Sequence, residues 1–155
     1  VLDCDNVLWG GILSEDGIEN LKLSGSGSGR VYQDFQQFVL SLFYHGVILA
    51  VCSKNDLSDV LSMFREHSEM ILKEEHIACF QVNWEDKPSN IKKIVEKLNI
   101  GLNSMVFVDG SPRRYFPYIG RISMQESMTF YCPRNCVFFK QFDLFSCHLV
   151  ISSGV

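Results

Sequence analysis

The sequence has no long apolar stretch and no block of like charges. No segment reaches the roughly 18 apolar residues that a membrane span needs, and the most apolar one, residues 136–155, is interrupted by Lys140, Gln141 and Asp143. The formal net charge is -4, with 14 basic and 18 acidic side chains. These absences argue against a membrane-embedded chain and against nucleic acid or an anionic membrane as the partner.

The sequence also lacks the pattern of a secreted disulfide scaffold. It has six cysteines, but a disulfide-rich domain is usually shorter and richer in loops. Cys52 and Cys79 lie inside apolar runs, which is typical of reduced, buried thiols. Cys132 and Cys136 form a single C-x3-C pair, whereas zinc sites usually show two close ligand pairs. We therefore expect reduced thiols in a cytoplasmic protein rather than a zinc site.

The chain shows no signal peptide and does not begin with Met. Only two residues precede Asp3, whereas a buried strand usually has five or six. The length of 155 residues is enough for one domain with a proper core. We therefore expect a single domain over residues 1–155 that forms part of a longer chain.

Short apolar runs recur along the sequence. Runs at residues 47–53, 77–83 and 104–110 are continuous, as in buried parallel strands. Residues 1–3 have the composition of a strand end. Residues 8–23 contain paired glycines and an Asp-Gly turn signal, which predict a small flap hairpin.

Helical spacing of apolar residues separates these runs. It covers residues 31–43, 57–64 and 91–98, and His45-Gly46 ends the first of these segments. The candidate helix caps are Asn55 or Asp56 for the second segment and Ser89 for the third. Strands that alternate with helices predict an α/β fold with an open parallel sheet flanked by helices.

Polar side chains follow the predicted strands. Asp3 and Asp5 come after the first strand, Ser53 and Asp109 come at the ends of two others, and Lys87 precedes a helix. Ligands of open α/β sheets bind beyond the carboxyl ends of the strands. Carboxylates suit a hard cation such as Mg²⁺, whereas a hydroxyl and an ammonium suit phosphoryl oxygens. The sequence therefore predicts a combined magnesium and phosphoryl site at this edge.

Four short motifs occur in a fixed order up to about residue 112. They are D-x-D-x-(T/V) in "DCDNV", a serine after the apolar run "VILAVCS", the lysine of "WEDK", and the acid of "VFVDG". Together they resemble the haloacid dehalogenase superfamily. The longer stretches "LDCDNVLWGG", "VILAVCSKND", "HIACFQVNWEDK" and "LNIGLNSMVFVDGSP" are similar to its FkbH-like branch, the glyceryl transferase/phosphatase domains of polyketide biosynthesis.

This resemblance implies a Rossmann-like haloacid dehalogenase fold and a role for each matching residue. Asp3 would be the nucleophile toward phosphorus, and Asp5 the general acid/base. Asp3, Asp109 and Asp5, the last through its backbone carbonyl, would hold Mg²⁺. Ser53 and Lys87 would bind the phosphoryl group and offset its charge.

The resemblance further implies a substrate and a partner. The branch removes phosphate from 1,3-bisphosphoglycerate and loads the glyceryl unit onto a phosphopantetheinylated acyl carrier protein. A thiolate is a good nucleophile for an activated acyl carbon, so Cys4 is a candidate to capture the glyceryl unit as a thioester. The alternative for Cys4 is a small buried residue, because its side chain can face the site only if the strand has already ended there.

Lys54, Asn55 and Trp9 are further candidates for substrate contact. Lys54 follows Ser53 and would either bind substrate or be solvated. Asn55 would either bind substrate or cap a helix. Trp9 would either form a wall of the pocket or only shape the hairpin.

The sequence departs from the superfamily pattern at one position and lacks one common feature. Gly110 stands where a second acid usually follows Asp109, so we expect weaker Mg²⁺ binding, which an acid at position 110 would tighten. The intervals from Asp5 to Ser53 and from Ser53 to Lys87 leave no room for a cap domain of roughly 50 or more residues. An open site would admit a large partner such as a carrier protein.

Two other functions remain compatible with the residues. One is a capless phosphatase of the same superfamily without acyl transfer, which needs the aspartates but not Cys4. The other is a catalytically inactive module that binds a carrier protein, which the glycine at position 110 suggests.

Overall fold

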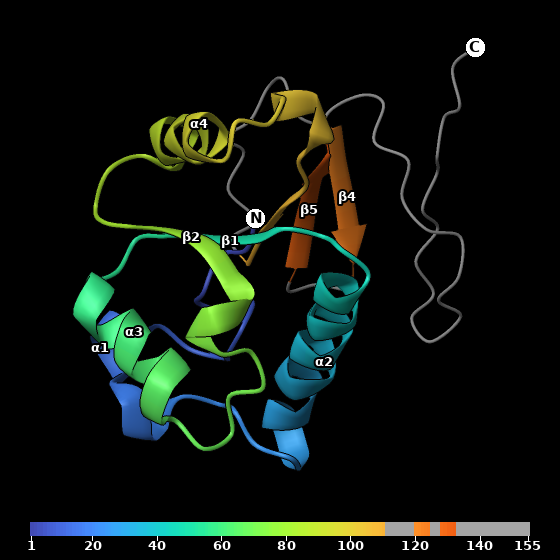
Figure 1. Cartoon of the computed structure of the whole chain (residues 1–155). Helices are drawn as coiled ribbons and strands as arrows, with labels where there is room; N and C mark the ends of the chain where they lie inside the picture. The colour runs from blue at the N-terminus through green and yellow to red at the C-terminus, as the bar shows by residue number, and fades with distance from the viewer. Residues whose placement is uncertain (111–119, 125–127, 133–155) are drawn as a thin grey trace.

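A parallel sheet forms the centre of the molecule (Figure 1). The computed structural model describes residues 1–110, 120–124 and 128–132, and of residues 103, 120–124 and 128–132 it describes only the backbone. Strand β1 (Leu49–Ser53) pairs in parallel with β2 (Ile77–Val82). The short segment around Leu2 lies between β1 and β3 (Phe107–Asp109), because Leu2 makes parallel bridges to both strands. The predicted open parallel sheet is confirmed.

Two further strands extend the sheet beyond β3. Strand β5 (Met128–Cys132) pairs antiparallel with β3, and β4 (Gly120–Met124) pairs antiparallel with β5. The sequence did not predict these strands, because the stretch after Pro112 shows no clean apolar periodicity. Of the cysteine pair considered for zinc, the side chain of Cys132 and the whole of Cys136 lie outside the described part of the chain.

Helices cover both faces of the sheet. Helices α2 (Arg30–Tyr44) and α3 (Leu57–Glu66) lie on one face, and α4 (Lys87–Leu98) lies on the other (Figure 1). The remaining helical segments are short: α1 (Leu13–Asp16), η1 (Ile18–Asn20), η2 (Gly27–Gly29), η3 (Glu74–His76) and η4 (Leu102–Ser104). No helix in the described ranges is both long and apolar enough to cross a membrane.

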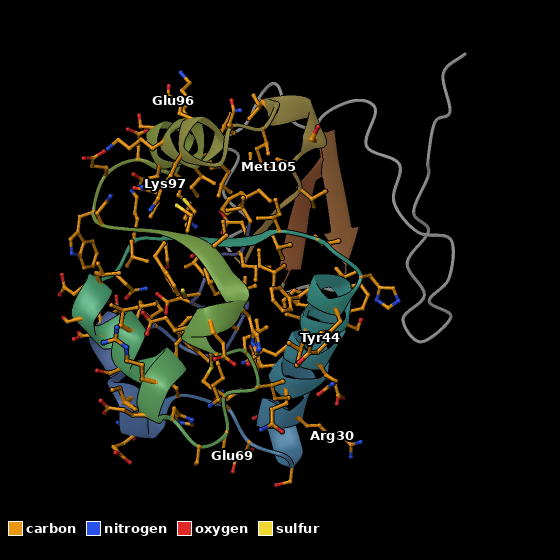
Figure 2. All side chains as sticks on the ribbon, viewed as in Figure 1. Arg30, Tyr44, Glu69, Glu96, Lys97 and Met105 are labelled. Carbon is orange, nitrogen blue, oxygen red and sulfur yellow. The ribbon has the colours of Figure 1, made fainter. Side chains whose placement is uncertain are left out.

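Alternation along β1 divides the core into two clusters. Leu49 and Val51 pack with side chains of α2 and α3, whereas Ala50 and Cys52 pack with side chains of α4. This follows from the pleat, because successive side chains of a strand point to opposite faces. Met105 belongs to the cluster that contains Ile91 and Ile94 of α4, and Figure 2 shows it close to that helix. Strand β1 is thus buried on both faces, as its continuous apolar run predicted.

One helix end agrees with the prediction and one helix cap differs from it. Helix α2 ends at Tyr44 and is followed by His45 and Gly46 as predicted, and Gly46 has a φ of 87°, a conformation that favours glycine. Helix α4 is capped by Asp86 rather than by Ser89, because the Asp86 carboxylate accepts a hydrogen bond of 3.0 Å from the Ser89 backbone N–H. Lys87, predicted to precede this helix, is therefore its first residue.

The predicted flap hairpin is reduced to one pair of residues. Gly10 and Lys22 exchange two backbone hydrogen bonds of 3.0 and 2.7 Å in an antiparallel bridge. Between them the chain forms α1 and η1 instead of two extended strands. The flap (residues 10–22) is therefore a closed loop with two helical turns that lies next to Asp5.

Candidate active site

The ends of the parallel strands bring four predicted side chains together. Asp3 follows the central segment at Leu2, Ser53 is the last residue of β1, and Asp109 is the last residue of β3. Lys87 begins α4 and reaches the same edge. Asp3, Ser53 and Asp109 are buried, and the Lys87 side chain is 17% exposed. Parallel strands end at one edge of the sheet, so residues far apart in the sequence meet there.

Asp3 lies at the centre of the hydrogen bonds in this group. Its Oδ1 accepts bonds from the Ser53 hydroxyl at 2.7 Å and from the Cys4 backbone N–H at 2.8 Å. Its Oδ2 accepts a bond of 2.6 Å from Lys87 Nζ. A carboxylate oxygen has about two lone-pair positions. Both positions are occupied on Oδ1, so Oδ2 keeps one for a further partner.

Lys87 links the two buried carboxylates. Its Nζ lies 2.6 Å from Asp3 Oδ2 and 3.0 Å from Asp109 Oδ1. Burial raises the pKa of Asp3 to about 6, and the nearby Asp109 carboxylate also raises it, although Lys87 acts in the opposite direction. Burial alone would lower the pKa of Lys87, but its two carboxylate partners together raise it. One ammonium therefore faces two carboxylates, which leaves an uncompensated negative charge when all three groups are ionised.

The group provides oxygen atoms and negative charge for a cation. Asp3 and Asp109 supply carboxylates, and hard cations such as Mg²⁺ prefer oxygen ligands. The backbone carbonyl of Asp5 lies beside the end of β3, because a Cβ atom on Gly110 would be only 2.7 Å from it. The described residues contain no set of three or more His, Cys, Asp or Glu side chains that could hold a metal. The donors thus fit a magnesium site of two carboxylates, one carbonyl and waters.

Gly110 has a steric reason to be glycine. A Cβ atom at this position would lie 2.7 Å from the Asp5 carbonyl oxygen and 2.9 Å from the Asn6 carbonyl oxygen. Real Cβ atoms essentially never approach backbone atoms this closely. These contacts argue against the expectation that an acid at position 110 would tighten Mg²⁺ binding, since a side chain there would push against the Asp5 carbonyl.

The Asp5 carboxylate points toward the flap and not toward Asp3. Its Oδ1 accepts hydrogen bonds from the Trp9 indole N–H at 3.0 Å and from the Leu13 backbone N–H at 3.1 Å. Its Oδ2 accepts one from Asn55 Nδ2 at 3.0 Å. The side chain of Asp5 thus bonds to the flap and to Asn55 and not to the group of Asp3, Lys87 and Asp109. Trp9 is fully buried and donates to Asp5, so it orients Asp5 and does not form a wall of the pocket.

Cys4 belongs to the core and not to the site surface. The chain does turn after Asp3, because the Cys4 carbonyl accepts hydrogen bonds from the backbone N–H groups of Val7 and Leu8. The Cys4 side chain, however, is 0% exposed and packs in the cluster of α2 and α3. Burial, followed by the nearby Asp3 charge, raises the pKa of its thiol well above the usual range. The burial of Cys4 therefore favours the alternative of a small buried residue over the nucleophile.

The loops after β1 and β2 form the rim of the site. Lys54 is exposed, whereas Asn55 is buried and bonds to Asp5 and Ser53 instead of capping α3 or facing solvent. Trp84, which the sequence analysis did not single out, is 59% exposed. Its indole N–H donates a 2.9 Å bond to the carboxylate of Asp56. It was recognisable only as an aromatic residue three positions before Lys87 in "NWEDK".

Comparisons with known proteins support the fold and the kind of site. The chain matches no protein-family model and no curated protein. It is similar to a solved structure from Bacteroides fragilis, the N-terminal part of the protein BF1531, which contains a phosphatase domain and was crystallised in complex with Mg. The two share 46% sequence identity with a TM-score of 0.69, and the match covers 72% of this chain and 30% of that one. This chain thus spans about a third of the relative's length.

Proposed function

We propose that the chain is a magnesium-dependent phosphatase of the haloacid dehalogenase type. The observation that carries the proposal is the bonding of Asp3, whose Oδ1 has two donors while its Oδ2 has only Lys87. Oδ2 is therefore the oxygen that is free to attack phosphorus. The similarity to a phosphatase domain crystallised with Mg supports the same conclusion.

The residues divide the reaction into two steps. In the first, Asp3 Oδ2 forms a bond to phosphorus, the bond to the leaving oxygen breaks, and Asp5 gives that oxygen a proton. In the second, water attacks the phosphorus of the aspartyl phosphate, Asp5 takes a proton from it, and phosphate leaves. Ser53 and Lys87 keep the carboxylate of Asp3 in place throughout.

Asp109 and the Asp5 carbonyl would hold the magnesium ion together with Asp3, whose Oδ1 would exchange one of its two hydrogen bonds for the ion. When bound, Mg²⁺ supplies positive charge that offsets the phosphoryl oxygens and the two carboxylates. Lys87 contributes to the same balance, since its ammonium already contacts both carboxylates. A chain without a second acid at position 110 still provides the few protein ligands that Mg²⁺ usually takes.

Release of inorganic phosphate tests this function. The wild-type chain should release phosphate from acetyl phosphate and p-nitrophenyl phosphate when Mg²⁺ is present. Asp3→Asn should lower the rate by at least about 100-fold, because an amide cannot act as the anionic nucleophile. Asp34→Asn is the matched control, since Asp34 is exposed on α2 and only pairs with Arg30. If the wild type showed no turnover and no Mg²⁺ binding, the inactive carrier-binding module would be favoured instead.

The narrower part of the proposal is glyceryl transfer. Resemblance to the FkbH-like branch suggests 1,3-bisphosphoglycerate as substrate and a phosphopantetheinylated acyl carrier protein as acceptor, in a cytoplasmic polyketide pathway. The absence of a cap domain from the described residues supports this proposal, because an uncovered site would admit a carrier protein. The residues between Asp5 and Lys87 form only the flap, α2, β1, α3, β2 and short helical turns. Since Cys4 is buried, the pantetheine thiol would attack the acyl carbon directly, which forms the thioester and releases the C1 phosphate, while Asp3 would remove the phosphate ester at C3.

Intact-mass analysis separates glyceryl transfer from simple hydrolysis. After incubation with 1,3-bisphosphoglycerate, Mg²⁺ and the carrier protein, we expect a glyceryl adduct on the carrier and none on the chain itself. Cys4→Ala should load the carrier at a rate similar to that of the wild type. Phosphate release without any adduct would identify a capless phosphatase without acyl transfer.

A further inference from the structure

Asn55 connects the nucleophile to the proton-transfer residue. It lies in the loop between β1 and α3, and the residue is only 1% exposed. Its Nδ2 donates hydrogen bonds to Asp5 Oδ2 at 3.0 Å and to Ser53 Oγ at 3.1 Å. Ser53 in turn donates its hydroxyl hydrogen to Asp3 Oδ1 at 2.7 Å. One amide group therefore joins the two carboxylates that the reaction uses.

The direction of these bonds follows from the available hydrogens. Ser53 has a single hydroxyl hydrogen, and the Asp3 carboxylate takes it, so the Ser53 oxygen can only accept from Asn55. The ionised Asp5 carboxylate can likewise only accept. Both neighbours thus require N–H groups, which fixes the amide of Asn55 in one of its two orientations.

This orientation leaves the other end of the amide without a partner. Asn55 Oδ1 is buried, and no group among the described residues donates a hydrogen bond to it. An unpaired buried acceptor costs about 1–3 kcal/mol. Folding stability alone does not explain why an asparagine occupies this position. The hydrogen bonds that Asp5 and Ser53 accept from its Nδ2 do explain it.

The bond to Asp5 also selects which of its oxygens can carry a proton. Oδ1 has two donors from the flap, Trp9 Nε1 and the Leu13 backbone N–H, so its lone pairs are occupied. Oδ2 has one donor, Asn55, and keeps a lone pair. Oδ2 is therefore the oxygen that exchanges a proton with the substrate, and the N–H of Asn55 determines where it points.

We propose that Asn55 is a positioning residue that aims Asp5 Oδ2 at the leaving group while holding Ser53 against Asp3. This inference rests on the proposed phosphatase function and assigns Asn55 a role other than binding substrate. It predicts a specific defect. Without Asn55, the steps that need a proton from Asp5 slow down more than the steps that do not.

The dependence on the leaving group tests this role. An alkyl phosphate needs a proton on its leaving oxygen, whereas p-nitrophenyl phosphate loses a stable phenolate without one. For Asn55→Ala we expect kcat/KM to fall by about 10- to 100-fold with the alkyl phosphate, since general acid catalysis contributes about 100-fold or more. With p-nitrophenyl phosphate we expect kcat/KM to fall by less than about 5-fold, because its phenolate leaves without a proton from Asp5.

A second buried amide provides the control. Gln36 is also fully buried, but its bonds go to the Leu8 carbonyl and to the backbone N–H groups of Ile71 and Leu72. Gln36→Ala should lower the melting temperature and leave the ratio of the two kcat/KM values unchanged. Asn55→Ser, which is shorter and cannot reach both partners, replaces Asn55→Ala if that variant does not fold.

Equal losses with both substrates, or losses below about 2-fold with both, would overturn the positioning role while leaving the phosphatase function intact. Absence of turnover by the wild-type chain with either substrate would instead reject the phosphatase function, and the role of Asn55 with it.

Discussion

At the scale of single residues, the site depends on an unequal balance of charge. Lys87 gives one ammonium to two buried carboxylates, at 2.6 Å from Asp3 and 3.0 Å from Asp109. Burial of a carboxylate favours its neutral form, and the pKa of Asp3 is accordingly raised to about 6. The folded chain thus holds a nucleophile that is destabilising at neutral pH until a cation joins it.

Replacement of Asp3 should reveal this cost as a gain in stability. The pKa of Asp3 rises from 3.8 to about 6 on folding, so its contribution to stability is full below pH 3.8 and is lost as the pH rises through 6. A shift of about 2 pH units corresponds to ~3 kcal/mol at most, and the weakened pairing of Lys87 reduces the gain. In EDTA at pH 8, Asp3→Asn should therefore be about 1–3 kcal/mol more stable than the wild type in urea unfolding.

This difference should shrink as the pH falls from 6 to 4, because wild-type Asp3 then becomes neutral as well. Asp34→Asn should show no such gain, since Asp34 is exposed. A variant that is less stable than the wild type at pH 8 would mean that the ion pair with Lys87 outweighs the cost of burial.

Gly110 gives a second prediction at this scale. In Gly110→Ala the new Cβ would meet the Asp5 and Asn6 carbonyl oxygens at 2.7 and 2.9 Å, so the loop after Asp3 must move. We expect a loss of about 1–3 kcal/mol in stability, typical of overpacking, together with weaker Mg²⁺ binding by calorimetry. In Gly101→Ala the nearest atom would be Ser104 Oγ at 3.9 Å, and this variant should match the wild type. Unchanged Mg²⁺ affinity in Gly110→Ala would argue against a role for the Asp5 carbonyl.

At the scale of secondary structure, most elements could be predicted from the sequence, since each buries a continuous face. The runs that became β1, β2 and β3 are mostly apolar because helices cover both sides of the sheet. The flap was only partly predictable. Its glycines and turn signal indicated a reversal of the chain, but the hydrogen bonds from Trp9 and Leu13 to Asp5 arise only in the folded chain.

The same limit applies to the site residues. Asp3, Ser53, Lys87 and Asp109 could be predicted because each follows a strand or begins a helix at one edge of the sheet. The roles of Cys4 and Asn55 could not, because both depend on which way a side chain turns where regular structure has ended. The pattern and spacing of residues in a sequence do not show in which direction such a side chain points.

Helix α4 gives a prediction at the scale of elements. Asn90 is fully buried and exchanges two hydrogen bonds with Asn83, at 2.7 and 3.1 Å. This pair ties the loop after β2 to the helix that begins with Lys87. Asn90→Ala should cost about 1–3 kcal/mol, as expected for lost buried hydrogen bonds, and should lower kcat because Lys87 is less firmly held.

Urea unfolding and phosphate release would measure both effects. Ser58→Ala on α3 is a suitable control, because its hydroxyl bond to Asp59 is exposed. An Asn90→Ala variant that loses stability but keeps the wild-type kcat would show that the pair supports α4 without placing Lys87.

At the scale of the whole molecule, the site joins segments from opposite ends of the described chain. Asp3 and Asp109 lie 106 positions apart in the sequence, and the backbone hydrogen bonds of residues 1–3 to Ala50 and Val108 bring them to one edge. A cation held by both carboxylates therefore binds the folded chain and not the unfolded one. Such binding stabilises the fold as a whole.

Thermal unfolding should detect this coupling without any substrate. At a Mg²⁺ concentration of about 100 times Kd, binding adds ~2.7 kcal/mol, which corresponds to a rise of about 5–10 °C in Tm for a chain of this size. Asp109→Asn should abolish most of the rise, whereas Asp34→Asn should keep it. A Tm that does not respond to Mg²⁺ in the wild type would exclude a site shared by the two carboxylates.

The two tryptophans of the chain provide separate optical signals. Trp9 is fully buried and donates to Asp5, whereas Trp84 is 59% exposed on the rim and donates to Asp56. Iodide in solution should therefore quench the red-shifted fluorescence of Trp84 and leave the blue-shifted emission of Trp9. In Trp84→Phe the remaining emission comes from Trp9 alone, so a change in the surroundings of Asp5 could be followed in real time without an attached dye.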